Sequence, residues 1–175
     1  MKDKKRKKTW LGASLKGLMA ALLVTLVFNA EPAAPDSLVE KTTKDTGLGN
    51  VPIEKLTTEF KKIRKIKGHF DGGRWNSEVD QWMGRKHRLM IELGFRLTSG
   101  KYHRSDIGKL MDPPDQIVKK GHDLFKRITG QPGYDSLSAG SYEFLVYYWR
   151  GKHDFLFFTC DNNRIVNSSW WYAGE

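Results

Sequence analysis

The C-terminal third of the chain has a hydrophobic pattern that predicts β-strands. Three runs rich in aromatic and β-branched residues, at 142–149, 153–159 and 164–172, are separated by short polar turns. The first turn is Arg150-Gly151-Lys152, where the glycine admits a positive φ, and the second is Asp161-Asn162-Asn163, since Asn and Asp tolerate the left-handed region. The pattern therefore predicts a three-stranded antiparallel meander at 141–172.

Bulky side chains occupy both faces of this predicted sheet. Alternation along the strands assigns them to two sets: Phe144, Val146, Tyr148, Phe155 and Phe157 on one face, and Leu145, Tyr147, Trp149, Leu156 and Phe158 on the other. A sheet with helices on one face would carry polar residues on its other face. The sequence thus predicts either cover on both faces or one exposed aromatic patch, and such a patch is usually a partner or ligand site.

The preceding half of the chain has the spacing of helices. Apolar residues recur at helical intervals between Pro52 and Gly68, which marks a first helix. A second helix is expected from Ser77, which with Asp80 resembles a capping box, to Gly94. Its apolar stripe, expected to be core, is Val79, Trp82, Met83, Met90 and Leu93.

Two shorter helical segments follow. One is expected at 104–111 and ends before Pro113-Pro114, which cannot continue a helix. The other is expected at 117–128. The predicted fold class is therefore α+β, with helices in 52–128 packed on the small meander.

The N-terminal 30 residues look like a leader. A basic head, MKDKKRKK, precedes an apolar run at 17–28 and then small residues and prolines. This order is typical of a secretory signal peptide cleaved near Ala30 or Ala34, or of a signal anchor that crosses a membrane through residues 11–30. We expect a membrane-associated or secretory-pathway protein, and a cytoplasmic one if the leader is not functional.

The leader also holds most of the net positive charge of the chain. The formal net charge is +10, but residues 1–30 hold seven Lys/Arg and one acid, which leaves 23 basic and 19 acidic residues beyond them. The body of the chain is only mildly basic, so no nucleic-acid partner is expected, and an RNA-binding module is the weaker alternative. Residues 31–51 lack aromatics and are rich in Pro, Thr, Gly and charge, which predicts a flexible spacer before a domain at 52–175.

Candidate chemistry is sparse. The single cysteine, Cys160, excludes an intramolecular disulfide and a Cys-based zinc cluster, and no metal or cofactor motif occurs, so none is expected. His153 and Asp154 are adjacent on a predicted strand, so their side chains point to opposite faces and cannot form one dyad. No catalytic residue is predicted. The alternative is a small hydrolase whose site lies near the 150–154 hairpin and whose general base is His103 or His153.

A binding function is favoured instead. The aromatic sheet and the cations beside it predict a protein or peptide partner, with the oligomeric state left open. The candidate binding residues are Trp149, Arg150, His153, Trp170, Trp171 and Tyr172 on the strands, and Arg85 and Arg88 on the second helix.

Several segments resemble known proteins. GRKHRLM-x-ELG, PPD, YWRG-x-HDFL-x-F and WWYAGE, within 68–175, resemble an uncharacterised and mainly fungal family, which implies no activity. More distantly, residues 100–172 resemble the BamE-type (SmpA/OmlA) lipoprotein domain, which implies a short helix followed by a strand meander. The motif positions matched are Ile107, Leu110, Pro114 and Asp115. Asp112 stands where that family has Gly, His103 where it has a Ser or Thr cap, and its lipid-bearing Cys is missing.

Overall fold

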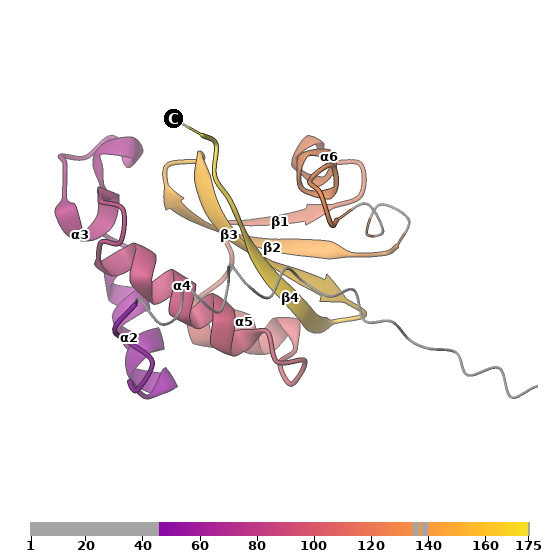
Figure 1. Cartoon of the computed structure of the whole chain (residues 1–175), viewed down its shortest axis with the longest axis horizontal. Coiled ribbons are helices and arrows are strands. Elements are labelled where there is room, and N and C mark those ends of the chain that lie inside the picture. The colour runs from indigo at the N-terminus through magenta and orange to yellow at the C-terminus, as the bar shows by residue number, and fades with distance from the viewer. Residues whose placement is uncertain (1–45, 135–136, 138–139, 175) are drawn as a thin grey trace, which may run out of the picture. The chain divides into compact units, whose positions relative to one another are not determined.

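The chain folds as an α+β domain around one antiparallel sheet (Figure 1). The computed structural model describes residues 46–134, 137 and 140–174. The predicted leader and most of the predicted spacer lie outside these residues. In the part of the chain that the structure describes, no helix is both long enough and apolar enough to cross a membrane.

The sheet has four strands in the order β1-β2-β3-β4, all antiparallel. Their bounds are β1 Gln116–Lys119, β2 Glu143–Arg150, β3 Asp154–Asp161 and β4 Arg164–Trp171. The predicted three-stranded meander is therefore one strand short. The helix expected at 117–128 is wrong over its first part, because Ile117 pairs with Leu145 in β1; its second part is α6, Asp123–Thr129. Four residues are too few to show a period, and pairing with β2 decides their conformation.

The predicted assignment of side chains to the two faces is confirmed. β2 and β3 pair with Leu145 opposite Phe158 and Tyr147 opposite Leu156, so each predicted set shares a face. The second predicted turn is also present, since Asn162 and Asn163 have φ values of 45° and 69°. Two consecutive residues with positive φ match the right-handed twist of the strands that they join.

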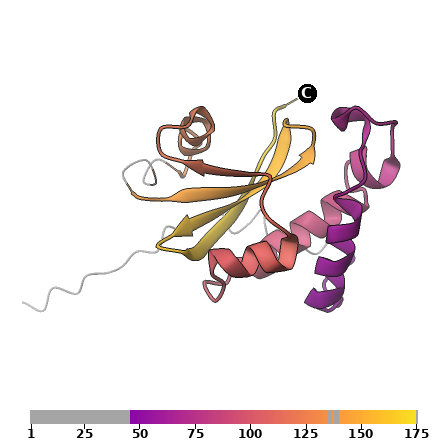
Figure 2. The same ribbon diagram turned by 180° about the vertical axis from the view of Figure 1, so that it is seen from behind.

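Both faces of the sheet are covered by helices, as Figures 1 and 2 show from opposite sides. One face, with Tyr147 and Trp149, packs against α2 (Ile53–Ile63), α4 (Arg85–Leu97) and α5 (Arg104–Met111). The other face packs against α6 and includes Phe125 and Phe144. Burial of each such side chain stabilises the fold by about 1.5–3 kcal/mol. Of the two arrangements predicted for a sheet with two apolar faces, the covered one is observed.

The helix predicted from Ser77 to Gly94 is interrupted. It consists of α3 (Ser77–Asp80) and α4, and Met83 between them has a φ of 57°. A Cβ on Gly84 would lie 2.5 Å from the carbonyl oxygen of Ser77, so the close turn admits only glycine there. The N-cap is Asn76 in place of Ser77, and its side chain accepts the Glu78 N–H. The interruption turns Trp82, predicted to be core, outward, and its side chain is 55% exposed.

The predicted short helix at 104–111 is confirmed as α5. Its N-cap is His103, whose backbone N–H donates to the Asp106 carboxylate at 2.9 Å. After Met111 the chain leaves the helix at Asp112, with a φ of 61°, before the two prolines. The Asp106 carboxylate thus satisfies the backbone N–H of the N-cap residue, as the third helical residue of a capping box does.

The packed region begins before the predicted boundary at residue 52. Thr46 and Leu48, assigned to the flexible spacer by composition, are both buried. Arg96 of α4 donates to the carbonyl oxygens of Leu48 and Val51 at 2.9 and 2.6 Å. Glu92 accepts from Arg96 and from the Thr46 hydroxyl, at 2.7 and 2.8 Å. The segment 46–51 is therefore fixed to α4 by polar contacts that composition does not reveal.

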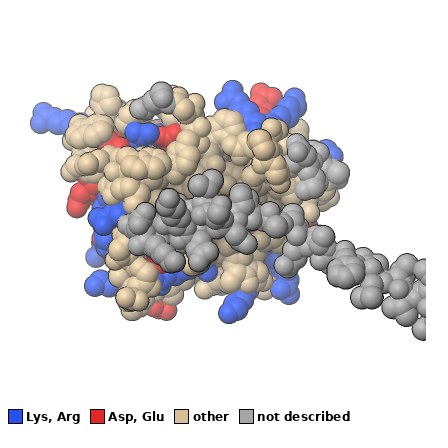
Figure 3. All heavy atoms as spheres, viewed as in Figure 1, with Lys and Arg blue, Asp and Glu red and all other residues tan. Residues whose placement is uncertain are grey.

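Lys and Arg side chains are spread around the face of the molecule shown in Figure 3, with Asp and Glu among them. On the described part of that face the cations do not merge into one continuous track. A polyanion-binding surface requires such a track along its backbone contacts. The weaker RNA-binding alternative stays a prediction.

Candidate functional site

A buried histidine lies at the centre of an aromatic cluster. His87, in the first turn of α4, is fully buried, and its ring stacks on Trp149 with centroids 3.9 Å apart and planes 9° apart. Trp170 meets the same imidazole edge-on at 4.9 Å, and Trp82 lies at 4.5 Å. Tyr172 completes the group, which we call the aromatic cluster: Trp82, His87, Trp149, Trp170 and Tyr172.

Two hydrogen bonds fix the tautomer of His87. The Met83 backbone N–H donates to Nδ1 at 3.1 Å, so the ring proton is on Nε2. Nε2 lies 3.2 Å from the Tyr172 hydroxyl oxygen and donates to it. Burial, reinforced by the charge of Arg150 and partly opposed by Asp154, lowers the pKa of His87 to about 3. The imidazole is therefore neutral near pH 7.

The cluster has a rigid floor. The Trp149 indole N–H donates to the Val79 carbonyl oxygen at 2.8 Å. The Arg150 guanidinium lies over the Trp149 ring, 4.3 Å from its centroid, and donates to the Asp154 carboxylate. The other oxygen of Asp154 accepts the Ala173 N–H at 3.0 Å. These contacts fix the chain on both sides of the cluster and so set the position of Tyr172.

Three members of the cluster reach the surface, and we call them the aromatic patch: Trp82, Trp170 and Tyr172. Trp82 is 55% exposed, Tyr172 is 41% exposed and Trp170 is half-buried. Tyr172 stacks on Trp170 with ring planes 2° apart and meets Trp82 at 5.3 Å. The patch therefore presents connected ring faces to solvent above a buried, hydrogen-bonded layer. Such a surface suits contact with apolar groups of a partner.

The structure brings four of the predicted binding residues together: Trp149, Arg150, Trp170 and Tyr172. Trp149 is the buried floor of the cluster and contributes no surface of its own. Arg150 is half-buried and engaged with Asp154, so it supports the floor.

The other four predicted binding residues lie elsewhere: His153, Trp171, Arg85 and Arg88. Trp171 lies on the opposite face of the sheet and stacks on Phe155 at 6.2 Å. Arg85 forms an ion pair with Glu59 of α2, and its hydrogen bond lowers the pKa of that carboxyl. Arg88 donates to the Thr46 carbonyl oxygen at 3.4 Å. His153 is exposed in the β2–β3 turn.

Sequence reasoning missed Trp82 as a surface residue and His87 altogether. A signal for His87 is present, since His87, Met90 and Gly94 are spaced i, i+3 and i+7 and share one face of α4. Gly94 on that face approaches β3, where a Cβ would lie 2.9 Å from Leu156 Cδ1. A single histidine on a core-facing stripe therefore marked the buried position.

The two histidines considered as a catalytic base do not converge. His103 pairs with Arg164, beside the turn at the end of β3, whereas His153 immediately precedes the first residue of β3. An eight-residue strand spans about 25 Å, so the two imidazoles lie at opposite ends of the sheet. Across residues 46–134, 137 and 140–174, no group of three His, Cys, Asp or Glu side chains is arranged to hold a metal ion.

Protein-family models, curated proteins and solved structures were compared with the chain, and none matches. The resemblances to the fungal family and to the BamE-type domain therefore stay predictions. Any function must be argued from the geometry of the aromatic patch and of the charged groups around it.

Proposed function

We propose that this protein is a non-enzymatic interaction domain that binds a protein or peptide through the aromatic patch. The observation that carries the proposal is the exposure of Trp82 and Tyr172, at 55% and 41%, above a buried and hydrogen-bonded support. Tryptophan and tyrosine are the residues most enriched at the energetic centres of protein interfaces. Each provides a large contact area and has few rotatable bonds to immobilise.

The support beneath the patch strengthens this proposal. His87 stacks on Trp149 and donates to the Tyr172 hydroxyl, so the rings above them are held before any partner arrives. A partner that binds a preorganised surface loses less conformational entropy than one that must order it. The flat, stacked faces of Trp170 and Tyr172 suit a partner segment with an aromatic or proline side chain.

The leader predicted at 1–30 completes the proposal. We propose that it tethers the domain to a membrane or exports it, with membrane contact through residues 11–30. This part rests on the order of the basic head, the apolar run and the small residues in the sequence.

Substitution of Trp82 by Ala tests the patch. Selection of binding peptides from a displayed random library, followed by titration of the full-length protein, gives the affinity. We expect W82A to weaken binding at least tenfold, because truncation of an interface anchor costs about 2 kcal/mol or more. Thermal stability is expected to change little, since more than half of the Trp82 side chain is exposed.

The matched control is Trp75→Ala, because Trp75 is 60% exposed and makes no ring contact with the aromatic cluster in the described structure. W75A should bind like the wild type. Equal affinity for W82A and wild type would contradict the proposed surface.

A separate variant tests the hydrolase alternative. The double variant H103A/H153A should restore full function to native-host cells that lack the wild-type protein, and loss of function with a folded variant would favour the hydrolase alternative.

A further inference from the structure

A cavity of about 400 Å³ lies beside the β2–β3 turn, bounded by the segment after α2, the short η1 helix (His69–Asp71) and the start of α4. Its volume is within the range of small-ligand sites, about 300–1,000 Å³. Five of its lining side chains are cationic and two are carboxylates. The lining therefore carries an excess of positive charge.

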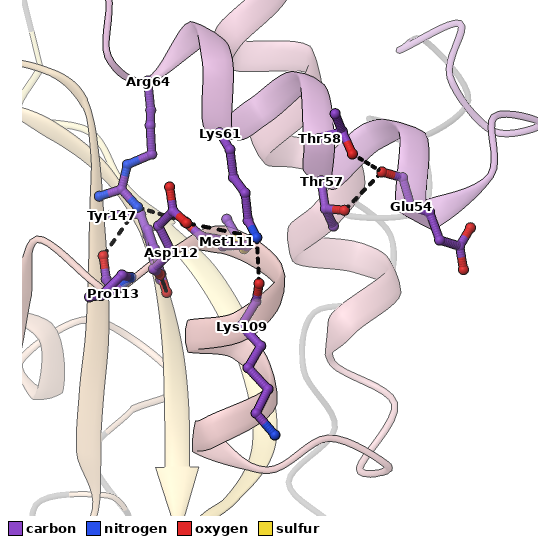
Figure 4. Close-up of polar contacts among 10 residues, drawn as sticks. All are labelled: Glu54, Thr57, Thr58, Lys61, Arg64, Lys109, Met111, Asp112, Pro113 and Tyr147. Atoms are coloured by element: carbon purple, nitrogen blue, oxygen red, sulfur yellow. Dashed lines mark hydrogen bonds and ion pairs between the residues drawn. The ribbon is translucent and has the colours of Figure 1, made fainter.

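One ion pair in the lining is already satisfied. Arg64 donates to Asp115 at 2.7 Å, and the other oxygen of Asp115 accepts the Tyr148 N–H at 2.8 Å. Arg64 also donates to the carbonyl oxygens of Met111 and Pro113, as Figure 4 shows, so its guanidinium is occupied by the end of α5. Four lysines and one carboxylate then remain in the lining: Lys65, Lys67, Lys86, Lys152 and Asp71.

Lys86 differs from the other three lysines because it is only 4% exposed. Its ammonium donates to the Trp149 carbonyl oxygen at 2.7 Å, which uses one of its three N–H groups. Among the described residues, no carboxylate lies within ion-pair distance of it. A buried ammonium without a directly paired carboxylate is costly, and burial lowers the pKa of Lys86, although the charges of Asp71 and Asp115 partly oppose this shift. An anion in the cavity would relieve this cost.

We propose that the cavity binds a phosphate group, with Lys86 at its base and Lys65, Lys67 and Lys152 at its rim. The three rim lysines are exposed and come from two separate segments, so they can reach different oxygens of one ligand. A phosphate offers several strong acceptor oxygens and up to two negative charges, and lysine is a common phosphate ligand. This site is separate from the aromatic patch, and the inference does not depend on the proposed function.

Titration of the full-length protein with inorganic phosphate, at constant ionic strength against chloride, tests the site by isothermal calorimetry. The wild type should show saturable binding. Lys86→Met keeps the buried aliphatic stem but lacks the charge, and it should weaken binding at least tenfold. Lys62→Met removes an exposed cation of α2 that does not line the cavity, and it should bind like the wild type.

The exposed rim provides a test that does not rely on a buried substitution. The double variant K65Q/K152Q removes two rim charges and should weaken phosphate binding several-fold, whether or not K86M folds. Absence of saturable phosphate binding by the wild type would overturn the proposal. Unchanged affinity in both K65Q/K152Q and a folded K86M would do the same.

Vesicles distinguish a free phosphate from a lipid headgroup. Full-length wild type and K65Q/K152Q are compared on phosphatidylcholine vesicles with and without 10% phosphatidic acid. Because both proteins carry the same leader, a loss of phosphatidic-acid-dependent binding in the variant assigns the site to a headgroup phosphate. Equal vesicle binding by both, together with saturable binding of inorganic phosphate to the wild type, assigns it to a soluble ligand.

Discussion

His87 shows how one buried residue supports an exposed surface. Its imidazole stacks on Trp149 and meets Trp170 edge-on, accepts a backbone N–H at one nitrogen and donates to Tyr172 at the other. Both ring nitrogens are thus satisfied without a charge, as a buried polar group requires. The same burial that makes His87 a good support makes it a poor general base near neutral pH, because its pKa is about 3.

The depressed pKa of His87 predicts a loss of stability in mild acid. Below about pH 6.5 the unfolded chain binds a proton at this imidazole, whereas the folded protein does not until about pH 3. Stability should therefore fall as pH is lowered between these values, by up to ~1.4 kcal/mol per pH unit from this group. Urea unfolding at several pH values measures the slope.

The variant His87→Asn isolates this contribution. The Asn oxygen can accept the Met83 N–H in place of Nδ1, but the side chain does not titrate, so the slope between pH 6.5 and pH 3 should shrink. His153→Asn, in the exposed turn, serves as the control and should keep the wild-type slope. An unchanged slope in H87N would contradict the assignment of the acid sensitivity to His87.

At the scale of elements, α4 connects most of the features described above. Its first turn supplies Lys86 to the cavity and His87 to the aromatic cluster, and Gly94 on its inner face approaches β3. Its last turns supply Glu92 and Arg96, which bind the segment 46–51. Helix formation alone explains none of these roles. They follow from the side chains that each face of α4 presents to a different neighbour.

The contact between α4 and the segment 46–51 predicts the effect of Arg96→Met. This change removes the hydrogen bonds to the Leu48 and Val51 carbonyl oxygens and leaves the buried Glu92 carboxylate without its cation. Each lost bond costs about 0.5–1.5 kcal/mol, so exchange of the Leu48 and Val51 amides should accelerate about tenfold or more. Hydrogen exchange monitored by mass spectrometry measures it. Arg127→Met, an exposed change on α6, should leave the exchange of those amides unaffected.

At the scale of the molecule, one sheet is shared by two cores. The helices α2, α4 and α5 cover one face and α6 covers the other, so the same three long strands contribute side chains to both cores. The aromatic patch and the cavity both lie near the β2–β3 turn and the start of α4. The binding surfaces therefore depend on the whole packed assembly, because their supports come from strands and helices far apart in sequence.

Sharing of the sheet predicts that loss of packing on either face destabilises the whole domain. Phe125→Ala on α6 and Phe60→Ala on α2 remove side chains that are 3% and 1% exposed, one from each core. Each should cost about 3–5 kcal/mol. Far-UV and near-UV circular dichroism should report one coincident transition for each variant. A separate early transition in F125A would show that the α6 face unfolds independently.

The sequence by itself determined the fold class, the three long strands, the distribution of their side chains between two faces, the second turn and α5. These features depend on alternation, turn residues and prolines, which act within a few positions of the chain. The sequence also named Trp149, Trp170 and Tyr172 as candidate binding residues, and the structure brings these three side chains together. Alternation also places Trp171 on the face opposite to Trp170, but the sequence alone does not show that α6 covers the face of Trp171.

The tertiary structure alone decided the pairing of β1, the interruption before α4, the exposure of Trp82 and the burial of His87 and Lys86. For the pairing of β1 and the burial of His87 and Lys86, the deciding partner is distant in sequence: Leu145 for Ile117, Trp149 for His87, and the Trp149 carbonyl for Lys86. Local propensity is worth only a few tenths of a kcal/mol per residue, whereas pairing and burial contribute several times more. Where the two compete, contacts between distant segments determine the conformation.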